Sequence, residues 1–264
     1  MSNALIGYTG FVGSTLLKQR PFECLYRSIN IGEISGKSFD LVISAGAPAQ
    51  KWIANREPEV DRQKIEGLIA HLKTTQCKTF VLISTVDVFK NPLDVTEKTV
   101  IDVDGLHAYG AHRRMLEEFV EQNFPSYLIV RLPGLVGPGL RKNVIFDFLN
   151  NNNLRTIDSR SVFQFYPMVN LWPDIQTALN AKLKVVHLTA EPISVAEVAG
   201  SGFGKPFDQV LAGVPATYDM CSVHAKVYGG DGAYQYSKRE TIQAIRTYAQ
   251  SEPITVKTIS GAGG

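Results

Sequence analysis

The chain has 264 residues, of which 44% are hydrophobic and 20% are charged, and 27 basic residues against 25 acidic ones give a formal net charge of +2. This mixture is typical of a soluble globular protein and argues against a disordered chain. The basic and acidic residues are interspersed, which excludes the strong positive field expected of a protein that binds nucleic acid or an anionic membrane.

The three cysteines, Cys24, Cys77 and Cys221, lie far apart in the sequence and form no recognisable pairing pattern. Such thiols are typical of a reducing compartment. The first residues, MSNALIGYTG, lead directly into a fold motif, and no apolar run approaches the roughly eighteen residues of a membrane span. We therefore expect a cytoplasmic protein. The scattered histidines predict no metal site.

Short apolar runs alternate with helical patterns through the first half, as in βαβ units around a parallel sheet. Strands are predicted at 4–8, 23–28, 39–46, 79–85 and 126–133, and helices at 11–20, 58–76 and around 109–123. The run at 39–46 is continuously apolar, which is typical of a strand covered on both faces. In the helix at 58–76, Ile65, Leu68, Ile69 and Leu72 form one apolar stripe.

The rhythm changes after about residue 133. A Gly- and Pro-rich loop at 133–143 precedes a predicted helix at 144–154, a short strand at 161–169 and a helix at 173–181. A strand is predicted at 185–190, and Ser194 with Glu197 predicts a capped helix at 193–200. Residues 203–238 have no regular pattern, and a helix is predicted at 238–250.

Glycines at 7, 10 and 13 lie between a predicted strand and a predicted helix. At such a junction glycine permits a tight turn and close approach to a pyrophosphate, which the helix N-terminus then binds. The motif predicts a dinucleotide site, although glycines at this spacing can also serve packing alone. Arg27 and Ser28 end the second strand, where an acidic residue would favour NAD. Arg27 can also be an ordinary solvated residue at the end of a strand. If it binds the cofactor, Arg27 and Ser28 favour NADP(H) over NAD(H).

Polar residues lie at the end of the strand predicted at 79–85 and at the beginning of the next helix. Ser84 and Thr85 end the strand, and Tyr109 lies one helical turn before Arg113. A nearby cation lowers the pKa of a tyrosine, and a neighbouring hydroxyl can share a developing oxyanion with it. The spacing alone also fits an ordinary pair on a helix surface, and His112 is interpreted as a surface residue.

The order of these motifs, GxxGxxG, a strand ending in Ser/Thr, YGxx followed by a basic residue, and RLPGLVGPG, resembles the extended short-chain dehydrogenase/reductase superfamily. Within it the chain resembles the epimerase/dehydratase branch, and ISTVDVF is similar to the corresponding segment of dTDP-4-dehydrorhamnose reductases. The resemblance covers nearly the whole chain, strongly over 4–140 and weakly over 200–264.

The resemblance implies roles for residues by position. Thr85, Tyr109 and Arg113 would be catalytic. The cofactor would be bound by Gly7, Thr9, Gly10, Phe11, Val12, Gly13, Arg27, Ser28, Ala45, Gly46, Ala47, Leu132 and Pro133. The substrate would be bound by Ser84, Asn143, Gln164 and Tyr166, although the aromatic residues Phe163, Phe165, Tyr166 and Trp172 fit the core of a small domain better than a stacking platform.

Three features depart from the family pattern. Arg113 replaces the lysine of the catalytic triad, and Gly134 stands where epimerases often have an asparagine. A strand–helix pair between the glycine motif and residue 39 is abbreviated. The resemblance also implies a homodimer through the helices at about 59–76 and 107–123.

The expected fold is α/β, a Rossmann-type doubly wound parallel sheet. The NADP(H)-binding domain is expected at 1–133 with returning elements at about 171–200, a substrate region at 134–170 and 201–250, and a tail at 251–264. The expected function is NADP(H)-dependent reduction of a carbonyl on a nucleotide-linked 4-keto sugar. The alternatives are a nucleotide-sugar epimerase or dehydratase without net redox, or a regulatory NADP(H)-binding protein that has lost catalysis.

Overall fold

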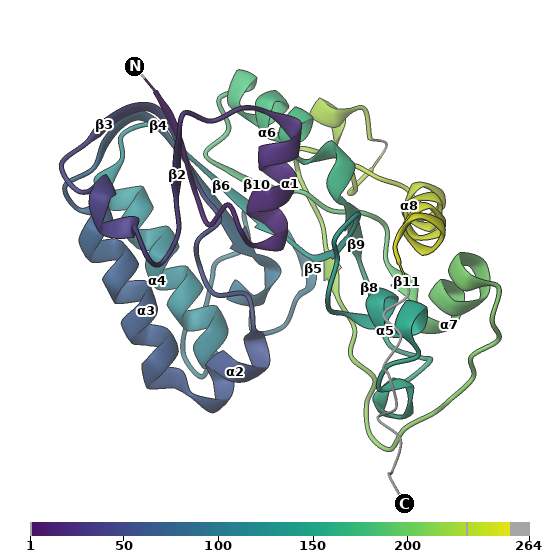
Figure 1. Cartoon of the computed structure of the whole chain (residues 1–264). Coiled ribbons are helices and arrows are strands. Elements are labelled where there is room, and N and C mark those ends of the chain that lie inside the picture. Colours follow the sequence, from purple (N-terminus) through teal and green to yellow (C-terminus); the bar gives the residue numbers. More distant parts are fainter. Residues whose placement is uncertain (1, 231, 254–264) are drawn as a thin grey trace, which may run out of the picture.

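A parallel sheet of six strands, in the order β10-β6-β4-β3-β1-β2, forms the centre of the larger lobe (Figure 1). The structure is a computed structural model and describes residues 2–230 and 232–253, so most of the expected tail lies outside the described residues. The sheet strands are β1 (Asn3–Ile6), β2 (Cys24–Tyr26), β3 (Ser38–Ser44), β4 (Gln76–Thr85), β6 (Tyr127–Leu132) and β10 (Val185–His187). The predicted doubly wound α/β fold is confirmed.

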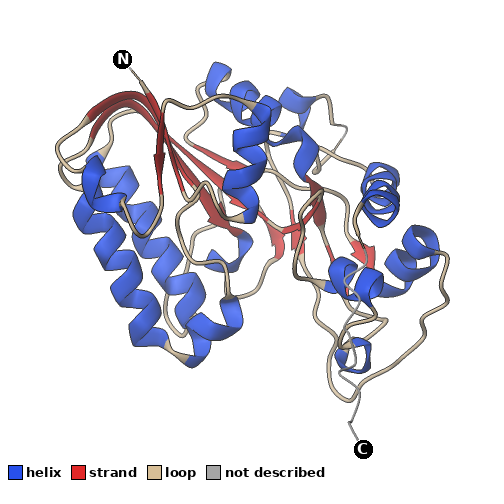
Figure 2. Cartoon of the chain, in the orientation of Figure 1, coloured by secondary structure: helices blue, strands red, loops and turns tan. Residues whose placement is uncertain are grey.

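Helices cover both faces of this sheet because each face is apolar (Figure 2). Helices α3 (Pro58–Leu72) and α4 (Ala108–Asn123) pack on one face, where the predicted stripe of Ile65, Leu68 and Leu72 is buried. Helices α1 (Phe11–Gln19) and α6 (Leu171–Asn180) pack on the other face. A short helix, α2 (Lys51–Arg56), was not predicted and lies between β3 and α3.

The expected abbreviation between the glycine motif and β3 is present. After β2 the chain makes only a single-turn helix (Ile31–Ile34) before it enters β3, and β2 is the last strand of the sheet. In the common strand order of dinucleotide-binding folds another strand lies outside this position. The sheet therefore ends at β2.

A smaller lobe is built from short elements around a separate core that includes Ile145, Phe165, Ile193, Val198 and Ile245. The remaining strands and α-helices of the chain are β5 (Leu93–Val95), β7 (Gly134–Val136), α5 (Val144–Asn150), β8 (Val162–Phe163), β9 (Phe165–Pro167), β11 (Ile193–Ser194), α7 (Val195–Glu197), β12 (Asp219–Met220) and α8 (Lys238–Ser251). A π-helical turn continues α7 over Val198–Gly202.

The chain crosses between the lobes more than once. Helix α6 and strand β10 return to the large sheet as expected, but residues 193–199, expected to return with them, pack in the core of the small lobe. The reason is the side chains themselves, since Ile193, Val195 and Val198 are fully buried there. The predicted capping box of Ser194 and Glu197 is confirmed.

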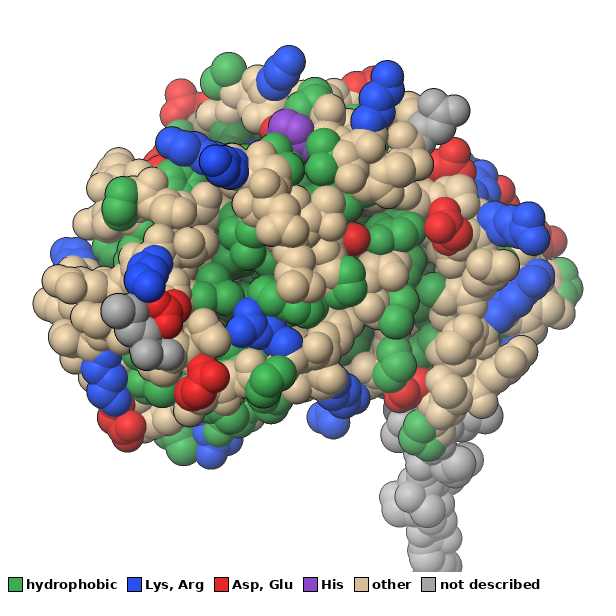
Figure 3. All heavy atoms as spheres, turned by 90° about the horizontal axis from the view of Figure 1, so that it is seen from above, with side chains coloured by type: hydrophobic (Ala, Val, Ile, Leu, Met, Phe, Trp, Pro, Cys, Tyr) green, Lys and Arg blue, Asp and Glu red, His purple; other side chains and the backbone are tan. Residues whose placement is uncertain are grey.

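Lysine, arginine, aspartate and glutamate side chains are interspersed over the face seen in Figure 3. Over the described ranges, none of the helices combines the length and the hydropathy that a membrane-spanning segment needs.

Candidate active site

The glycine motif forms a tight turn between β1 and α1. Gly7 has a φ of +81°, and a Cβ atom there would lie 2.3 Å from the carbonyl oxygen of Ala45. A Cβ atom on Gly13 would lie 2.1 Å from the carbonyl oxygen of Gly7. Only glycine fits either position, and α1 begins after Gly10 without a side-chain cap. The first N–H groups of α1 are therefore free to bind an anion.

The other residues expected to bind the cofactor lie at the carboxyl ends of neighbouring strands. Arg27 and Ser28 are exposed after β2, Ala45–Ala47 follow β3, and Leu132 with Pro133 ends β6. Ser44 ends β3, and its buried hydroxyl has no hydrogen-bond partner among the described residues. The carboxyl edge of the sheet thus carries the polar groups and the open turn that a dinucleotide requires.

Thr85 and Tyr109 meet at this same edge. Thr85 ends β4, and Tyr109 lies in the first turn of α4, where its N–H donates to Oδ1 of Asn55 at 3.0 Å. His107 caps the helix by accepting a hydrogen bond from the N–H of Gly110 at its Nδ1. A Cβ atom on Gly110 would lie 2.1 Å from the carbonyl oxygen of Asp87. This close approach brings the start of α4 against the turn that follows Thr85.

The environment of Tyr109 keeps its proton on the phenol. The side chain is 8% exposed, and burial raises its pKa above the ordinary value. The positive charge of Arg113 and a hydrogen bond with Thr85 act in the opposite direction. The balance leaves the pKa raised, so the phenol of Tyr109 is protonated at neutral pH.

Arg113 is held in place by several groups. It is 3% exposed, and its Nη1 donates to Asp61 while its Nη2 donates to the carbonyl oxygen of Pro48. The guanidinium lies 4.0 Å from the ring centroid of Tyr109, within the range of a cation–π contact. Its Nε is buried and has no hydrogen-bond partner within the described part of the chain. Arg113 therefore fixes Tyr109 and retains one unused donor.

A second charged cluster surrounds Asp87, two residues after Thr85. Asp87 accepts a hydrogen bond from Lys51 Nζ at 2.6 Å and one from Tyr218 Oη at 3.3 Å. Lys51 also donates to Tyr218 at 3.2 Å. Tyr218 precedes β12, so this cluster joins the small lobe to the edge where Thr85 and Tyr109 lie.

A buried carboxylate fixes α4 against the sheet beneath these residues. Glu117 is 0% exposed and accepts hydrogen bonds from Ser84 Oγ at 2.5 Å and from Arg131 Nε at 3.0 Å and Nη2 at 2.8 Å. Arg114 donates to it as well, at 3.0 Å. Glu117 lies eight residues after Tyr109 and Ser84 lies next to Thr85, so this contact sets the register of helix and strand.

Solved structures with the same architecture cover almost the whole chain. A dTDP-4-dehydrorhamnose reductase from Bacillus anthracis in complex with NADP has a TM-score of 0.70, 15% identity, and coverage of 95% of this chain and 98% of its own. The UDP-glucose 4-epimerase of Thermotoga maritima with UDP-glucose has the same TM-score, identity and coverages. The Bordetella bronchiseptica enzyme WbmG with NAD and UDP has a TM-score of 0.72, 14% identity, and coverages of 94% and 93%.

This chain has the fold of the extended short-chain dehydrogenases/reductases. No family model and no curated protein matches its sequence.

Within this fold, the side chains of the four residues expected to bind substrate each have hydrogen-bond partners within the protein. Ser84 bonds to Glu117 beneath the edge. Asn143 caps α5 with a φ of 107°, and its amide donates to the carbonyl oxygen of Leu135. Gln164 is buried and makes all its hydrogen bonds with Thr189, Ala190 and Met220. Tyr166 is fully buried, with its hydroxyl on Asp174.

The structure explains why residue 134 is a glycine. It lies opposite Phe165 in the pairing of β7 with β9, and a Cβ atom there would lie 2.6 Å from the carbonyl oxygen of Gln164. An asparagine side chain does not fit unless β7 and β9 separate. The backbone of Gln164 thus excludes a side chain at position 134, which is itself exposed.

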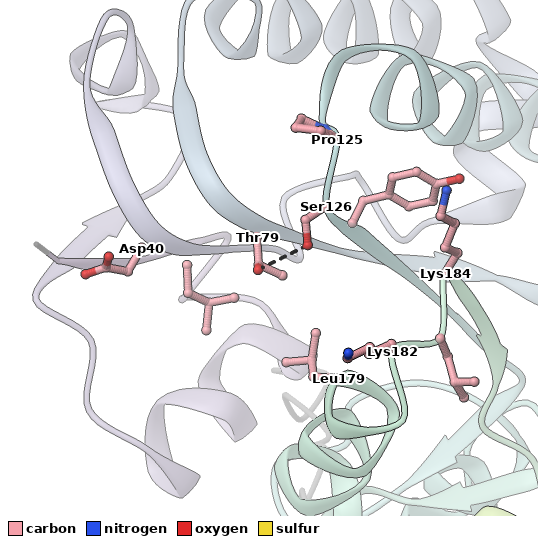
Figure 4. A pocket seen from close by; sticks show the side chains of 10 residues that line it. Asp40, Thr79, Pro125, Ser126, Leu179, Lys182 and Lys184 are labelled. Carbon is pink, nitrogen blue, oxygen red and sulfur yellow. Dashed lines mark hydrogen bonds between the residues drawn. The ribbon is translucent and has the colours of Figure 1, made fainter.

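Two other places can be set aside. A cavity of about 500 Å³ lies at the amino ends of β3, β4 and β6, the opposite edge from Tyr109, between Asp40, Thr79, Ser126, Lys182 and Lys184 (Figure 4). Ligands of open α/β sheets bind at the carboxyl ends. Asp94, Asp219 and Cys221 have ligand atoms within 4.8 Å of one another. Without a bound metal ion, burial and the charge of Asp219 raise the pKa of Cys221 to about 11, so the free thiol is protonated at neutral pH.

Sequence reasoning did not find Lys51, Asp61, Asp87 or Glu117. Two signals were present, because Asp61 lies four residues before Ile65 on the apolar stripe of α3, and Glu117 lies four residues after Arg113 on the buried face of α4. A charged residue on a buried helix face needs a partner. Lys51 offered no such signal, since α2 is short and its contacts are distant in sequence.

Proposed function

We propose that this protein is an NADP(H)-dependent oxidoreductase that reduces the keto group of a nucleotide-linked 4-keto sugar. The observation that carries the proposal is that Tyr109 and Thr85 lie at the same carboxyl edge of the sheet as the glycine turn. A phenol that keeps its proton at neutral pH is suited to protonate a carbonyl oxygen as it becomes an alkoxide.

The residues at this edge fit a dinucleotide cofactor. The uncapped N-terminus of α1 would hold the pyrophosphate, and the exposed Arg27 would bind the additional phosphate of NADP(H). The unused Nε of Arg113 would donate to a ribose hydroxyl. The cofactor would supply the hydride in the reaction.

The chain would supply the proton and the position of the substrate. Thr85 would hold the carbonyl oxygen beside the phenol of Tyr109, and Tyr109 would donate its proton to that oxygen. Arg113, fixed by Asp61, would stabilise the phenolate that remains, because its positive charge lies over the ring. Because Tyr109 and Arg113 are both buried, water would be excluded from the phenol.

The experiment is a screen of nucleotide-linked 4-keto sugars with NADPH, followed by the loss of absorbance of the reduced cofactor. Mass measurement of any nucleotide that co-purifies narrows the screen. Tyr109→Phe should abolish turnover and leave NADPH affinity within about twofold, since it removes only the proton donor. Full activity of Tyr109→Phe, or oxidation of no NADPH with any keto sugar, would contradict the proposal.

An epimerase without net redox is the second candidate, supported by the structural similarity to a UDP-glucose 4-epimerase. It predicts a tightly retained cofactor and interconversion of sugars with no consumption of NADPH. The third candidate, a regulatory protein that binds NADP(H), is suggested by Arg113 in place of lysine. It predicts cofactor binding without turnover, and no gain of activity in Arg113→Lys.

A further inference from the structure

Arg113 cannot perform one task that a lysine at its position can perform. A guanidinium stays protonated at every physiological pH, so it stabilises a phenolate but does not pass a proton to it. Both of its terminal nitrogens are also bound, one to Asp61 and one to Pro48. After Tyr109 has given its proton to a substrate, it needs another source of protons.

A continuous set of polar groups leads from Tyr109 toward the surface. The hydroxyl of Thr85 lies near enough to the phenol to lower its pKa, and this hydroxyl donates to Asp87 Oδ2 at 3.4 Å. The N–H of Asp87 donates to the same hydroxyl at 3.2 Å and fixes its position. The other carboxylate oxygen, Oδ1, accepts from Lys51 Nζ at 2.6 Å.

The exposure of these groups increases along the same path. Tyr109 is 8% exposed, the side chain of Asp87 is 16% exposed and that of Lys51 is 37% exposed. The two oxygens of Asp87 therefore face different neighbours, the hydroxyl of Thr85 on one side and a solvent-accessible ammonium on the other. We propose that Asp87 and Lys51 return protons from solvent to Tyr109 through Thr85, by a route that does not use residue 113.

The step balances with one proton from solvent per turnover. Tyr109 loses its O–H bond as the product gains one, and the phenolate then takes the proton of Thr85. Thr85 regains a proton from the carboxyl group of Asp87, which received it from the ammonium of Lys51 and reoriented. Lys51 takes a proton from water. This inference rests on the proposed function, because it assumes that Tyr109 donates a proton to a carbonyl oxygen.

A second lysine lies near the site but not on this path. Lys142 donates to the carbonyl oxygen of Ala49. Burial and the charge of Arg113 lower its pKa, whereas the charge of Asp87 raises it. Within the described ranges it has no hydrogen bond with Thr85, Asp87 or Lys51. The route through Asp87 therefore makes a prediction that distinguishes the two lysines.

The decisive variant is Lys51→Arg, which keeps the charge next to Asp87 but holds its proton. We expect steady-state turnover to fall by about 10- to 100-fold, in the range of a general acid–base contribution, while NADPH affinity stays within about twofold. Asp87→Asn should give a similar loss. In both variants a small weak acid such as imidazolium should restore turnover in proportion to its concentration, because it replaces the missing proton donor.

Lys78→Arg is the matched control. Lys78 forms an ion pair with Asp40 at 2.8 Å, close to the 2.6 Å of the Lys51–Asp87 pair, but at the other end of the sheet. It should keep its turnover and show no response to imidazolium. The proposal is overturned if Lys51→Arg turns over like the wild type, if imidazolium rescues neither variant, or if Lys142→Arg rather than Lys51→Arg shows the rescued defect.

A titration without cofactor separates this proposal from the proposed function. The absorbance of phenolate, with Tyr109→Phe subtracted, reports the pKa of Tyr109. Asp87→Asn should lower that pKa, and Lys51→Met should raise it, because the two charges act on the phenol in these directions. If neither variant changes the pKa of Tyr109, the link of Asp87 and Lys51 to Tyr109 is refuted, whatever the wild type catalyses. If both variants move it and the wild type reduces no carbonyl, the proposed function fails and the connection stands.

Discussion

Replacement of Glu117 by glutamine should destabilise the protein far more than its small chemical change suggests. Glu117 is fully buried, and its carboxylate accepts hydrogen bonds from Ser84, Arg114 and Arg131. Glutamine keeps the size of the side chain but removes the negative charge. Arg131, which is 3% exposed, is then left without a compensating charge. The loss of one member of a buried ion pair costs about 3–5 kcal/mol.

Urea denaturation of wild type and variant measures this loss as a difference in the free energy of unfolding. Glu118→Gln is the control, because Glu118 is the next residue of α4 and pairs with Arg114 at 3.2 Å, but its side chain is 47% exposed. An exposed pair contributes roughly 0–1 kcal/mol. The double variant Glu117→Leu with Arg131→Met should recover much of the loss, because it leaves no buried charge unpaired.

A stabilising role for the charge of Glu117 is refuted if Glu117→Gln and Glu118→Gln are equally stable, or if the double variant is less stable than Glu117→Gln. The first result would mean that Arg131 finds another partner at no cost. The second would mean that packing around Glu117 matters more than charge. Either result would also remove the argument that this contact sets the register of Tyr109 beside Thr85.

Three further outcomes follow from the structure. Burial lowers the pKa of His187 to about 4, so the unfolded chain binds a proton below pH 6.5 that the folded protein binds only below about pH 4. The free energy of unfolding should therefore fall by up to ~3 kcal/mol as the pH falls from 6.5 to 4. The variant His187→Gln should show a weaker dependence of stability on pH. Gly7→Ala should cost more stability than Gly36→Ala, by ~1 kcal/mol or more in urea denaturation, because both have positive φ but only at Gly7 would a Cβ atom meet backbone. Arg27→Ala should weaken binding of NADPH by roughly 10- to 100-fold and leave NADH unaffected, as loss of a charge-assisted contact to phosphate implies; equal effects on both cofactors, measured by calorimetry, would contradict this.

The sequence was sufficient for the elements that are long and strongly patterned. The apolar runs that form β3, β4 and β6 predicted a buried parallel sheet. The Ser194–Glu197 pattern predicted the capping box at the start of helix α7. A short strand was predicted at 161–169, where the structure has β8 and β9, but β5, β7 and β12 were not predicted, because two or three residues carry no measurable period. Residues 193–200 were predicted as one capped helix, whereas Ile193 and Ser194 form strand β11.

The site was predictable where chemistry is local and not where it depends on distant partners. The glycine motif and the Tyr109–Arg113 spacing are short patterns that can be found in sequence. The partner of Arg113 is Asp61, 52 residues earlier, and the partner of Asp87 is Lys51, 36 residues earlier. Both depend on how helices turn against the sheet, which no short pattern records. The expected substrate residues Gln164 and Tyr166 belong to the buried interior for that reason.

The end of the sheet at β2 bears on how the molecules behave in concentrated solution. β2 is hydrogen-bonded only to β1 within the sheet, so one side of its backbone is an open edge that another molecule could extend. The strand is three residues long, and Arg27 and Ser28 follow it at once. So short an edge, followed by a charge, offers too few backbone groups to template intermolecular pairing. A variant that lengthens β2 with apolar residues should therefore aggregate more readily than the natural chain.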